Sequence, residues 1–396
     1  MDLALFGGTP YRKNILQYGK QTISESDKQA VLDVLNENTF LTTGPRVELF
    51  ENKIKTFVNA EYAVAVNSGT AALHMALNCL NLKSSDEVIV ACLSFIASSN
   101  AIVYCNAKPI FCDIEENTLN IDPDKIESLI TQNTKAVITV DFAGQTCNYD
   151  KIKSITNKYN LVLIQDASHS LGTKYLNKMV GNIADLTTFS FHPVKNITTC
   201  EGGMVVTHNK NYYEKMKKFR NHGISVDFKQ REKIGGHYYD MTELGFNYRI
   251  PDLLCALGIN QLINLPDWIN KRNEIANIYD SHFKQMNKYI TLIEQKYDSA
   301  YHIYIIKLNL TNLNGTRDEI FKALRAEGLG VNVHYRPIHL NKFYKDNFKT
   351  HENMMPIAEK IYKEIITLPI FPTMTDNDIN DVVEILKKVI NYYKLE

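Results

Sequence analysis

The chain has little of what marks fibrous, disordered or disulfide-rich proteins. Its 396 residues include only 18 glycines and 11 prolines, well below the content of collagen-like or disordered chains. None of the seven cysteines belongs to a C-x-x-C pair, which argues against a zinc ribbon and a disulfide framework. We therefore expect free thiols in a reducing compartment. The cysteines are Cys79, Cys92, Cys105, Cys112, Cys147, Cys200 and Cys255.

An excess of one charge and long apolar runs are also missing. The 44 basic and 44 acidic side chains cancel to a formal charge of zero, so nothing favours a general attraction to nucleic acid or to anionic membranes. A local basic pocket for a small phosphorylated ligand is compatible with this balance. No apolar run reaches about 18 residues, and the first residues lack the pattern of a signal peptide. We expect a cytoplasmic, soluble protein with neither nucleic-acid nor membrane partners.

What the sequence does contain is an α/β pattern. Short apolar segments alternate with helix-like or loop segments, which predicts a mainly parallel seven-stranded sheet flanked by helices on both faces. A hydrophobic content of 44% fits a sizeable core, and the length suggests about two to three domains. The expected strands are Tyr62–Val66, Glu87–Val90, Pro109–Asp113, Ala136–Asp141, Leu161–Asp166, Leu186–Phe191 and Gly203–Thr207.

The two ends of the chain have a different pattern. Residues 1–20 are expected to form a loose arm, followed by a helix that Ser24 caps and a second helix from Pro45. The first helix has an expected apolar face of Ala30, Val31, Val34 and Leu35. After residue 250 the pattern predicts a long helix at Pro251–Tyr279, a strand at Tyr301–Leu308, a helix at Arg317–Glu327 and a strand at Val331–Tyr335. We therefore expect a large α/β domain at 1–250 and a small α+β domain at 251–396.

Candidate functional residues follow three of the expected strands, where open parallel sheets bind ligands. After Tyr62–Val66 comes Asn67-Ser68-Gly69-Thr70 and then a helix. Small residues at a helix start leave N–H groups and a positive dipole end open to a phosphate. A simple helix cap explains the same residues. The segment is neither a Walker loop nor a G-x-G-x-x-G motif, so it supports neither a P-loop nucleotidase nor a nicotinamide dehydrogenase.

A carboxylate and an amine follow two other strands. Asp166 ends the strand Leu161–Asp166 and is an N-cap, a metal ligand or the partner of a buried cation. Lys195 lies in the loop after Leu186–Phe191; a desolvated lysine has a lowered pKa and becomes a nucleophile that forms a Schiff base, although an exposed loop lysine is the alternative. An anion site, a carboxylate and an amine are the three groups that pyridoxal phosphate requires.

Six segments in order carry a resemblance over nearly the whole chain. They are LTTGPRVELFE, NSGTAALHMAL, QDASHSLGTKY, FSFHPVKNITTCEGG, GFNYRIPDLLCALGINQL and VHYRPIH. With these segments the chain resembles the DegT/DnrJ/EryC1/StrS family of sugar-nucleotide aminotransferases, which have the type I fold of pyridoxal-phosphate enzymes. FSFHPVKNITT and DFAGQ are most similar to the pseudaminic-acid branch, the UDP-4-amino-4,6-dideoxy-N-acetyl-β-L-altrosamine transaminases. Cys200 stands where relatives often carry glycine.

The resemblance implies roles for the cofactor-binding residues. Lys195 would form the internal aldimine with pyridoxal phosphate and move the proton between cofactor and substrate, and Asp166 would pair with the pyridinium nitrogen. Gly69, Thr70 and Ser190 would hold the phosphate.

Further roles have plain structural alternatives. Phe95 would stack on the ring or belong to the core, and His169 would orient the ring or cap a turn. Asn247 would reach the phosphate from the other subunit of a homodimer or only fix a turn.

Other residues are candidates for substrate contacts. These residues would contact the sugar or the diphosphate, or they are packed or solvent-exposed side chains without such a role. They are His192, His334, Arg336 and His339. The segment His222–Asp240 would be a lid that excludes water or an exposed loop.

The implied reaction moves an amino group from L-glutamate to C4 of a UDP-linked 4-keto-6-deoxy-N-acetylhexosamine, UDP-2-acetamido-2,6-dideoxy-β-L-arabino-hex-4-ulose, in pseudaminic acid biosynthesis. No metal is implied. Three alternatives stay open. One is transfer to another 3- or 4-keto sugar on a dTDP or GDP carrier. Another is a pyridoxamine-dependent dehydratase, which Lys195 argues against because that branch has histidine there. The last is a non-catalytic sugar-nucleotide-binding homologue.

Overall fold

The computed structural model describes residues 2–226 and 235–395. Its largest sheet has seven strands in the order β2-β10-β9-β6-β5-β3-β4. All are parallel except β10, which runs antiparallel to β2 and β9. Each of the seven predicted segments forms one of these strands. They are β2 (Tyr62–Val66), β3 (Glu87–Ala91), β4 (Lys108–Cys112), β5 (Thr134–Val140), β6 (Val162–Asp166), β9 (Leu186–Ser190) and β10 (Gly203–Thr207).

Helices cover both faces of this sheet, as the unbroken apolar strands predict. Along β2, Val64 and Val66 pack into the core on one face, and Ala63 and Ala65 pack into the core on the other, because successive side chains of a strand point to opposite faces. The helices of this region are α2 (Pro45–Val58), α3 (Gly69–Asn78), α4 (Ala97–Tyr104), α5 (Pro123–Ile126), α6 (Tyr149–Lys158) and α7 (Lys210–Arg220). A small hairpin, β7 (Lys174–Tyr175) and β8 (Lys178–Met179), follows β6.

The C-terminal region is built on a second, antiparallel sheet. This sheet consists of β11 (Ile290–Leu292), β12 (Tyr304–Leu308) and β14 (Ile365–Leu368) in the order β11-β12-β14. The predicted strand at Tyr301–Leu308 corresponds to β12. The strand predicted at Val331–Tyr335 is wrong: β13 covers only Leu329–Gly330, and Asn332 makes a single bridge to Thr367. The helices are α10 (Arg317–Ala326), α11 (Lys342–Phe348), α12 (Pro356–Tyr362) and α13 (Asp376–Tyr393).

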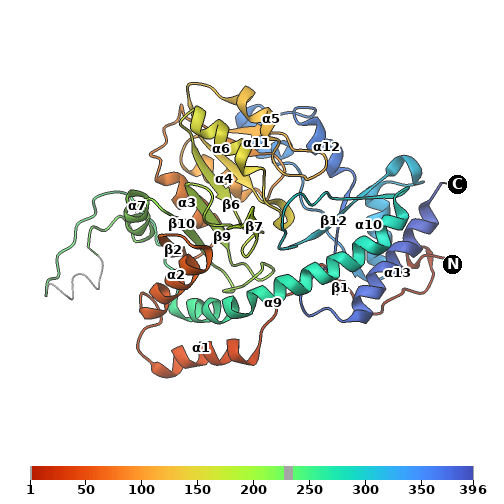
Figure 1. Ribbon diagram of the computed structural model, residues 1–396, viewed down its shortest axis with the longest axis horizontal. Helices are drawn as coiled ribbons and strands as arrows, with labels where there is room; N and C mark the ends of the chain where they lie inside the picture. The colour runs from red at the N-terminus through yellow and green to blue at the C-terminus, as the bar shows by residue number, and fades with distance from the viewer. Residues whose placement is uncertain (1, 227–234, 396) are drawn as a thin grey trace.

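One long helix, α9 (Asp252–Phe283), joins the two regions (Figure 1). Its first half packs Cys255, Leu262 and Leu265 into the core of the large sheet. Its second half packs Tyr279 and Phe283 into the core of the small sheet. α9 therefore contributes to both cores, and the division of the chain at residue 250 stays a prediction.

The N-terminal arm is not loose. Leu3 is fully buried, and β1 (Leu16–Gln17) pairs in parallel with β13. The carboxylate of Glu327, also fully buried, accepts hydrogen bonds from the N–H groups of Ala4 at 2.9 Å and Tyr11 at 3.0 Å. A buried carboxylate requires such donors, so it fixes the arm to the C-terminal region, and Figure 1 shows both chain ends there.

Helix α1 (Glu25–Glu37) begins where the capping residues predict, with Ser24 and Asp27 forming a capping box. The expected apolar face is only partly buried: Val34 is buried, Ala30 and Val31 are half-buried, and Leu35 is 49% exposed. The reason is that α1 lies on the outer side of α9, apart from the sheet (Figure 1), where a side-chain hydrogen bond from Gln261 to Asp27 (2.7 Å) holds it.

Three further findings bear on the sequence predictions. All seven cysteines have free thiols. Among the described residues, no helix combines the length and apolarity needed to cross a membrane. The expected lid at His222–Asp240 falls partly outside the described residues, at 227–234; of its flanks, Ser225 donates its N–H to the Asp240 carbonyl at 2.8 Å.

Candidate active site

The start of α3 lies against the ends of two neighbouring strands. Ser68 caps α3 by accepting the N–H of Ala71 at 3.0 Å, and the N–H groups of Gly69 and Thr70 precede the first intrahelical bond. A Cβ atom at Gly69 would lie 2.7 Å from Cβ of Ser190, so only glycine fits where α3 meets the end of β9. The predicted phosphate residues are therefore adjacent.

Asp166 ends β6 with its carboxylate held in a fixed orientation. The side chain is 4% exposed. One oxygen accepts the Ser98 hydroxyl at 2.7 Å, and the other accepts the N–H and hydroxyl of Ser168 at 3.1 and 2.6 Å. No described residue forms an ion pair with it. Because a carboxylate accepts about four hydrogen bonds, Asp166 retains the capacity to accept one more, from a protonated ring nitrogen.

Lys195 lies in the loop that joins β9 to β10. Its N–H donates to the carbonyl of His192 at 2.9 Å, and no described side chain or backbone group binds its amine. Desolvation lowers the pKa of this amine to about 8, and the charge of Asp166 opposes that shift. A sizeable fraction of the amine is therefore neutral and nucleophilic near neutral pH.

Two imidazoles lie close together beside this amine, with their ring planes tilted by 40°. The rings of His169 and His302 have centroids 4.3 Å apart, and both side chains are buried. Burial first, and then the charge of Lys195 among other neighbours, lowers the pKa of each imidazole well below its usual value. Neither Nδ1 atom has a hydrogen-bond partner. His169 is thus neutral, with one ring nitrogen free to meet a ligand.

The segment that follows β13 contributes Tyr335 and His334 to the surroundings of His169 and Lys195. The hydroxyl of Tyr335 lies 3.3 Å from Nε2 of His169, and its ring lies 6.1 Å from that of Phe95, which is 55% exposed. Nδ1 of His334 lies 2.8 Å from the Thr367 hydroxyl. Burial, with the charge of Lys195, lowers the pKa of His334 to about 3. A cis peptide bond joins His334 to Tyr335.

The remaining predicted residues lie in different surroundings. Asn247 is exposed, and its carbonyl accepts from the Asn67 amide at 3.5 Å, beside the start of α3. His192 is exposed in the Lys195 loop. Arg336 is exposed and donates to the carbonyl of Leu340 at 3.1 Å.

His339 is separate from this group. Its side chain is fully buried, with Nε2 3.0 Å from a carboxylate oxygen of Glu359 and its ring near Phe111. This placement favours a packing role over the predicted substrate contact.

The sequence reasoning did not single out four residues that line the site. Ser168 and Tyr335 stand within the quoted segments QDASHSLGTKY and VHYRPIH, so their position was available there. Ser98 lies three residues after the predicted ring-stacking residue Phe95, a spacing that could have indicated it. No sequence pattern pointed to His302, because it reaches His169 through the packing of the C-terminal region against the turn after β6.

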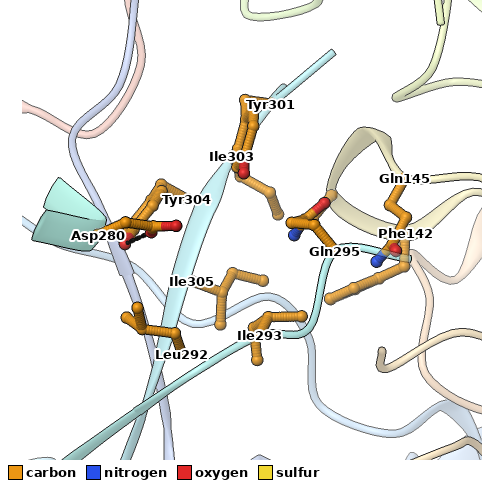
Figure 2. A pocket seen from close by; sticks show the side chains of 11 residues that line it. Phe142, Gln145, Asp280, Leu292, Ile293, Gln295, Tyr301, Ile303, Tyr304 and Ile305 are labelled. Carbon is orange, nitrogen blue, oxygen red and sulfur yellow. Dashed lines mark hydrogen bonds between the residues drawn. The ribbon is translucent and has the colours of Figure 1, made fainter. Parts of the chain in front are cut away.

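An enclosed pocket lies between the two regions, apart from Lys195 and Asp166. Figure 2 shows Phe142 and Gln145 on one side and Tyr301, Ile303 and Ile305 on the other. Its volume of about 20 Å³ has room for about one water molecule. The pocket therefore does not account for binding of a substrate.

The arrangement fits pyridoxal phosphate. The glycine at position 69 leaves space that a Cβ would fill beside Ser190, at a helix start suited to a phosphate. Asp166 has spare acceptor capacity, Lys195 has an unbound amine of lowered pKa, and His169 has an unpartnered Nδ1.

Comparisons with known proteins agree with this fit. A UDP-4-amino-4,6-dideoxy-N-acetyl-β-L-altrosamine transaminase of Campylobacter jejuni is 38% identical, over 96% of this chain and 99% of that protein. The structure of Helicobacter pylori PseC, an aminotransferase involved in the biosynthesis of pseudoaminic acid, is 33% identical, with a TM-score of 0.89 over 96% of this chain and all of that one. NtdA of Bacillus subtilis, solved with bound cofactor PMP, is 31% identical, with a TM-score of 0.83 over 93% and 83% of the two chains.

The family model described as the DegT/DnrJ/EryC1/StrS aminotransferase family matches residues 21–387. Together with the site geometry, this match shows that the chain belongs to the DegT/DnrJ/EryC1/StrS family of pyridoxal-phosphate-dependent aminotransferases.

Proposed function

We propose that this enzyme transfers an amino group from L-glutamate to C4 of UDP-2-acetamido-2,6-dideoxy-β-L-arabino-hex-4-ulose, a step of pseudaminic acid biosynthesis. The observation that carries the proposal is the 38% identity over nearly the full length of both chains with a transaminase named for the product of this reaction. The likeness to PseC supports it. The chemistry of the site supports the transamination itself, because Asp166 ends β6 and Lys195 lies in the loop that follows the neighbouring strand β9.

The proposed mechanism assigns a task to each of the central side chains. When bound, pyridoxal phosphate supplies an electron sink for the carbon that loses or gains a proton. The carboxylate of Asp166 would keep the ring nitrogen of the cofactor protonated. The amine of Lys195, with its pKa lowered to about 8, would accept the proton that one carbon loses and return it to another carbon. Such transfer is efficient when the pKa of the group lies near the working pH.

The surrounding residues orient the ring and exclude water. The N–H groups of Gly69 and Thr70 and the hydroxyl of Ser190 would hold the phosphate. Phe95 would cover one face of the ring, while His169 would lie beside it, held by Tyr335 at 3.3 Å. Because the imidazole of His169 is neutral, it would place no cation beside the ring and would not compete for the charge of Asp166.

We further propose that the enzyme acts as a homodimer in which the partner subunit's Asn247 completes the phosphate site. An exposed apolar surface beside α3 supports this assembly. The rings of Tyr104 and Phe246, 52% and 39% exposed, lie 5.5 and 5.2 Å from the ring of His74. Leu244 nearby in sequence is 76% exposed. Apolar patches of this kind mark interaction surfaces.

A panel of keto-sugar nucleotides tests the substrate. Purified enzyme loaded with pyridoxal phosphate is incubated with L-glutamate and UDP-, dTDP- or GDP-linked 3- and 4-keto sugars, and the configuration of the amine is determined by NMR. We expect the highest kcat/KM for the UDP-linked 4-keto-6-deoxy-N-acetylhexosamine. A preference for a dTDP- or GDP-linked sugar would assign the chain to another branch of the family, and the absence of turnover with every sugar would favour a binding protein.

A further inference from the structure

The segment Asp141-Phe142-Ala143-Gly144-Gln145, quoted above as DFAGQ, follows β5 directly. The proposed mechanism uses none of its residues. Because β5 pairs with β6, the segment lies beside the strand end that carries Asp166. Asp141 is fully buried, and no described residue forms an ion pair with it. A buried carboxylate without a counterion is costly, so its presence requires an explanation.

Four donors satisfy this carboxylate. One oxygen of Asp141 accepts the hydroxyl of Tyr149 at 2.6 Å and the N–H of Cys147 at 3.3 Å. The other oxygen accepts the amide of Gln165 at 2.7 Å and the hydroxyl of Ser170 at 2.6 Å. A network in which every polar group is satisfied holds its members in a single arrangement.

Two of these donors flank the cofactor residues of β6 and its following turn. Gln165 immediately precedes Asp166, and Ser170 immediately follows His169. The backbone adds a third tie, because the N–H of Asp141 donates to the carbonyl of Asp166 at 3.1 Å. Asp141 therefore holds the turn from both sides without reaching the ring itself.

The other residues of the segment bind the C-terminal region. The amide of Gln145 donates to the carbonyl of Glu294 at 2.9 Å, and its oxygen accepts the N–H of Lys296 at 2.6 Å. A Cβ at Gly144, whose φ is +105°, would lie 3.1 Å from both the carbonyl oxygen of His169 and the backbone nitrogen of His302. DFAGQ thus joins the turn after β6 to the segment that leads into β12 and carries His302, and Figure 2 shows Phe142 and Gln145 facing this segment at Tyr301 and Ile303.

We propose that Asp141 is a positioning residue for the cofactor: through Gln165 and Ser170 it fixes the turn that presents Asp166 and His169 to the pyridine ring. This inference rests on the assignment of Asp166 and Lys195 to pyridoxal phosphate. Asparagine cannot replace Asp141 without conflict. In one orientation its NH₂ group would face the N–H of Cys147, which cannot accept. In the other it would face the amide of Gln165, which could accept only by turning over and giving up the bond that its oxygen now accepts from the Thr187 hydroxyl at 3.1 Å.

The test is a pH titration of the visible absorbance of the holoenzyme, with the cofactor dissociation constant measured alongside. In Asp141→Asn, a loosened Asp166 stabilises the protonated ring nitrogen less, so the nitrogen that joins Lys195 to the cofactor becomes more basic. We expect the titration midpoint to rise by about one pH unit, as for the loss of an oriented charge partner. We expect the dissociation constant to rise at least about tenfold, as for the loss of one charge-assisted hydrogen bond.

Two variants separate positioning from general destabilisation. Asp252 is also fully buried and accepts two backbone N–H groups, from Gly44 and Arg46 at 2.8 and 2.9 Å, at the start of α2. Asp252→Asn should lower the melting temperature and leave the absorbance midpoint unchanged. Ser170→Ala removes one tie while Asp141 keeps its other donors, and should raise the midpoint by a smaller amount. This variant carries the test if Asp141→Asn does not fold.

Three outcomes decide the matter. A rise of the midpoint in Asp141→Asn or Ser170→Ala, absent in Asp252→Asn, supports the positioning role. A midpoint equal to that of the wild type in both Asp141→Asn and Ser170→Ala overturns it, and so does an equal rise in Asp252→Asn. A wild-type protein that binds no pyridoxal phosphate refutes the proposed function instead, which keeps the two failures distinguishable.

Discussion

Replacing Lys195 by methionine should stabilise the cofactor-free protein at neutral pH while abolishing covalent attachment of the cofactor. Methionine keeps the apolar stem and removes the charge. Burial lowers the pKa of the amine from 10.5 to about 8, although Asp166 opposes the shift. The native state therefore binds the proton more weakly than the unfolded state does, and the protonated amine destabilises the fold below pH 8.

The magnitude follows from the shift of the pKa. Each pKa unit corresponds to about 1.4 kcal/mol, and after a discount for the partial exposure of Lys195 we expect a gain of about 1–3 kcal/mol at pH 7. Between pH 8 and 10.5 the unfolded state binds more protons than the native state. The stability of the wild type consequently rises with pH across this window, and the advantage of the variant shrinks by more than half near pH 9.5.

Urea unfolding of the cofactor-free proteins at pH 7 and pH 9.5 measures this difference. The matched control is Lys53→Met, at an exposed lysine of α2, which should leave stability nearly unchanged at both pH values. If Lys195→Met is no more stable than the wild type at pH 7, or if the two proteins differ equally at both pH values, then the amine is not desolvated and the argument for its nucleophilic character fails.

Three more substitutions test other parts of the site. Asp166→Asn should lower kcat on the order of 10²–10³-fold with the cofactor still bound, as measured by steady-state kinetics and absorbance; unchanged kcat would contradict its role. Gly69→Ala brings a Cβ within 2.7 Å of Cβ of Ser190, so the affinity for the cofactor should fall about tenfold or more in a binding titration. Glu359→Gln should cost about 1–2 kcal/mol of stability through the bond to His339 and leave KM for the sugar nucleotide unchanged; a raised KM would return His339 to the substrate site.

Sequence patterns predict the strands of the large sheet, but they do not predict the N-terminal arm or the segment after β13. The strands β2 to β6, β9 and β10 are continuous apolar runs, so each was found. The strand predicted at Val331–Tyr335 failed because Val331 and Val333 pack into the apolar cores without a continuous partner strand, and only Asn332 bridges to another strand. The arm was misjudged because its anchor, Glu327, lies more than 300 residues away in sequence, where no local pattern points to it.

The same limit applies to the site. Asp166, Lys195 and Gly69 follow strands that could be predicted, and the geometry of a parallel sheet brings such strand ends together. His302 approaches His169 where DFAGQ joins the C-terminal region to the turn after β6. Contacts of this kind depend on two regions packing together, and the spacing of residues within either region does not reveal them.

Protonation states are the feature of this site that depends most on structure. Three histidines and a lysine surround one carboxylate, and with ordinary pKa values these side chains would form a pocket with a positive charge at mildly acidic pH. Burial reverses this reading: the pKa of His334 falls to about 3, and burial also lowers the pKa of His169 and His302 well below the usual value. Because the imidazoles stay neutral, they do not pair with Asp166, and its charge remains directed to the ring nitrogen. Desolvation thus lowers the pKa of the imidazoles as it lowers the pKa of Lys195. Both shifts are required for one carboxylate and one amine to act on the same ring.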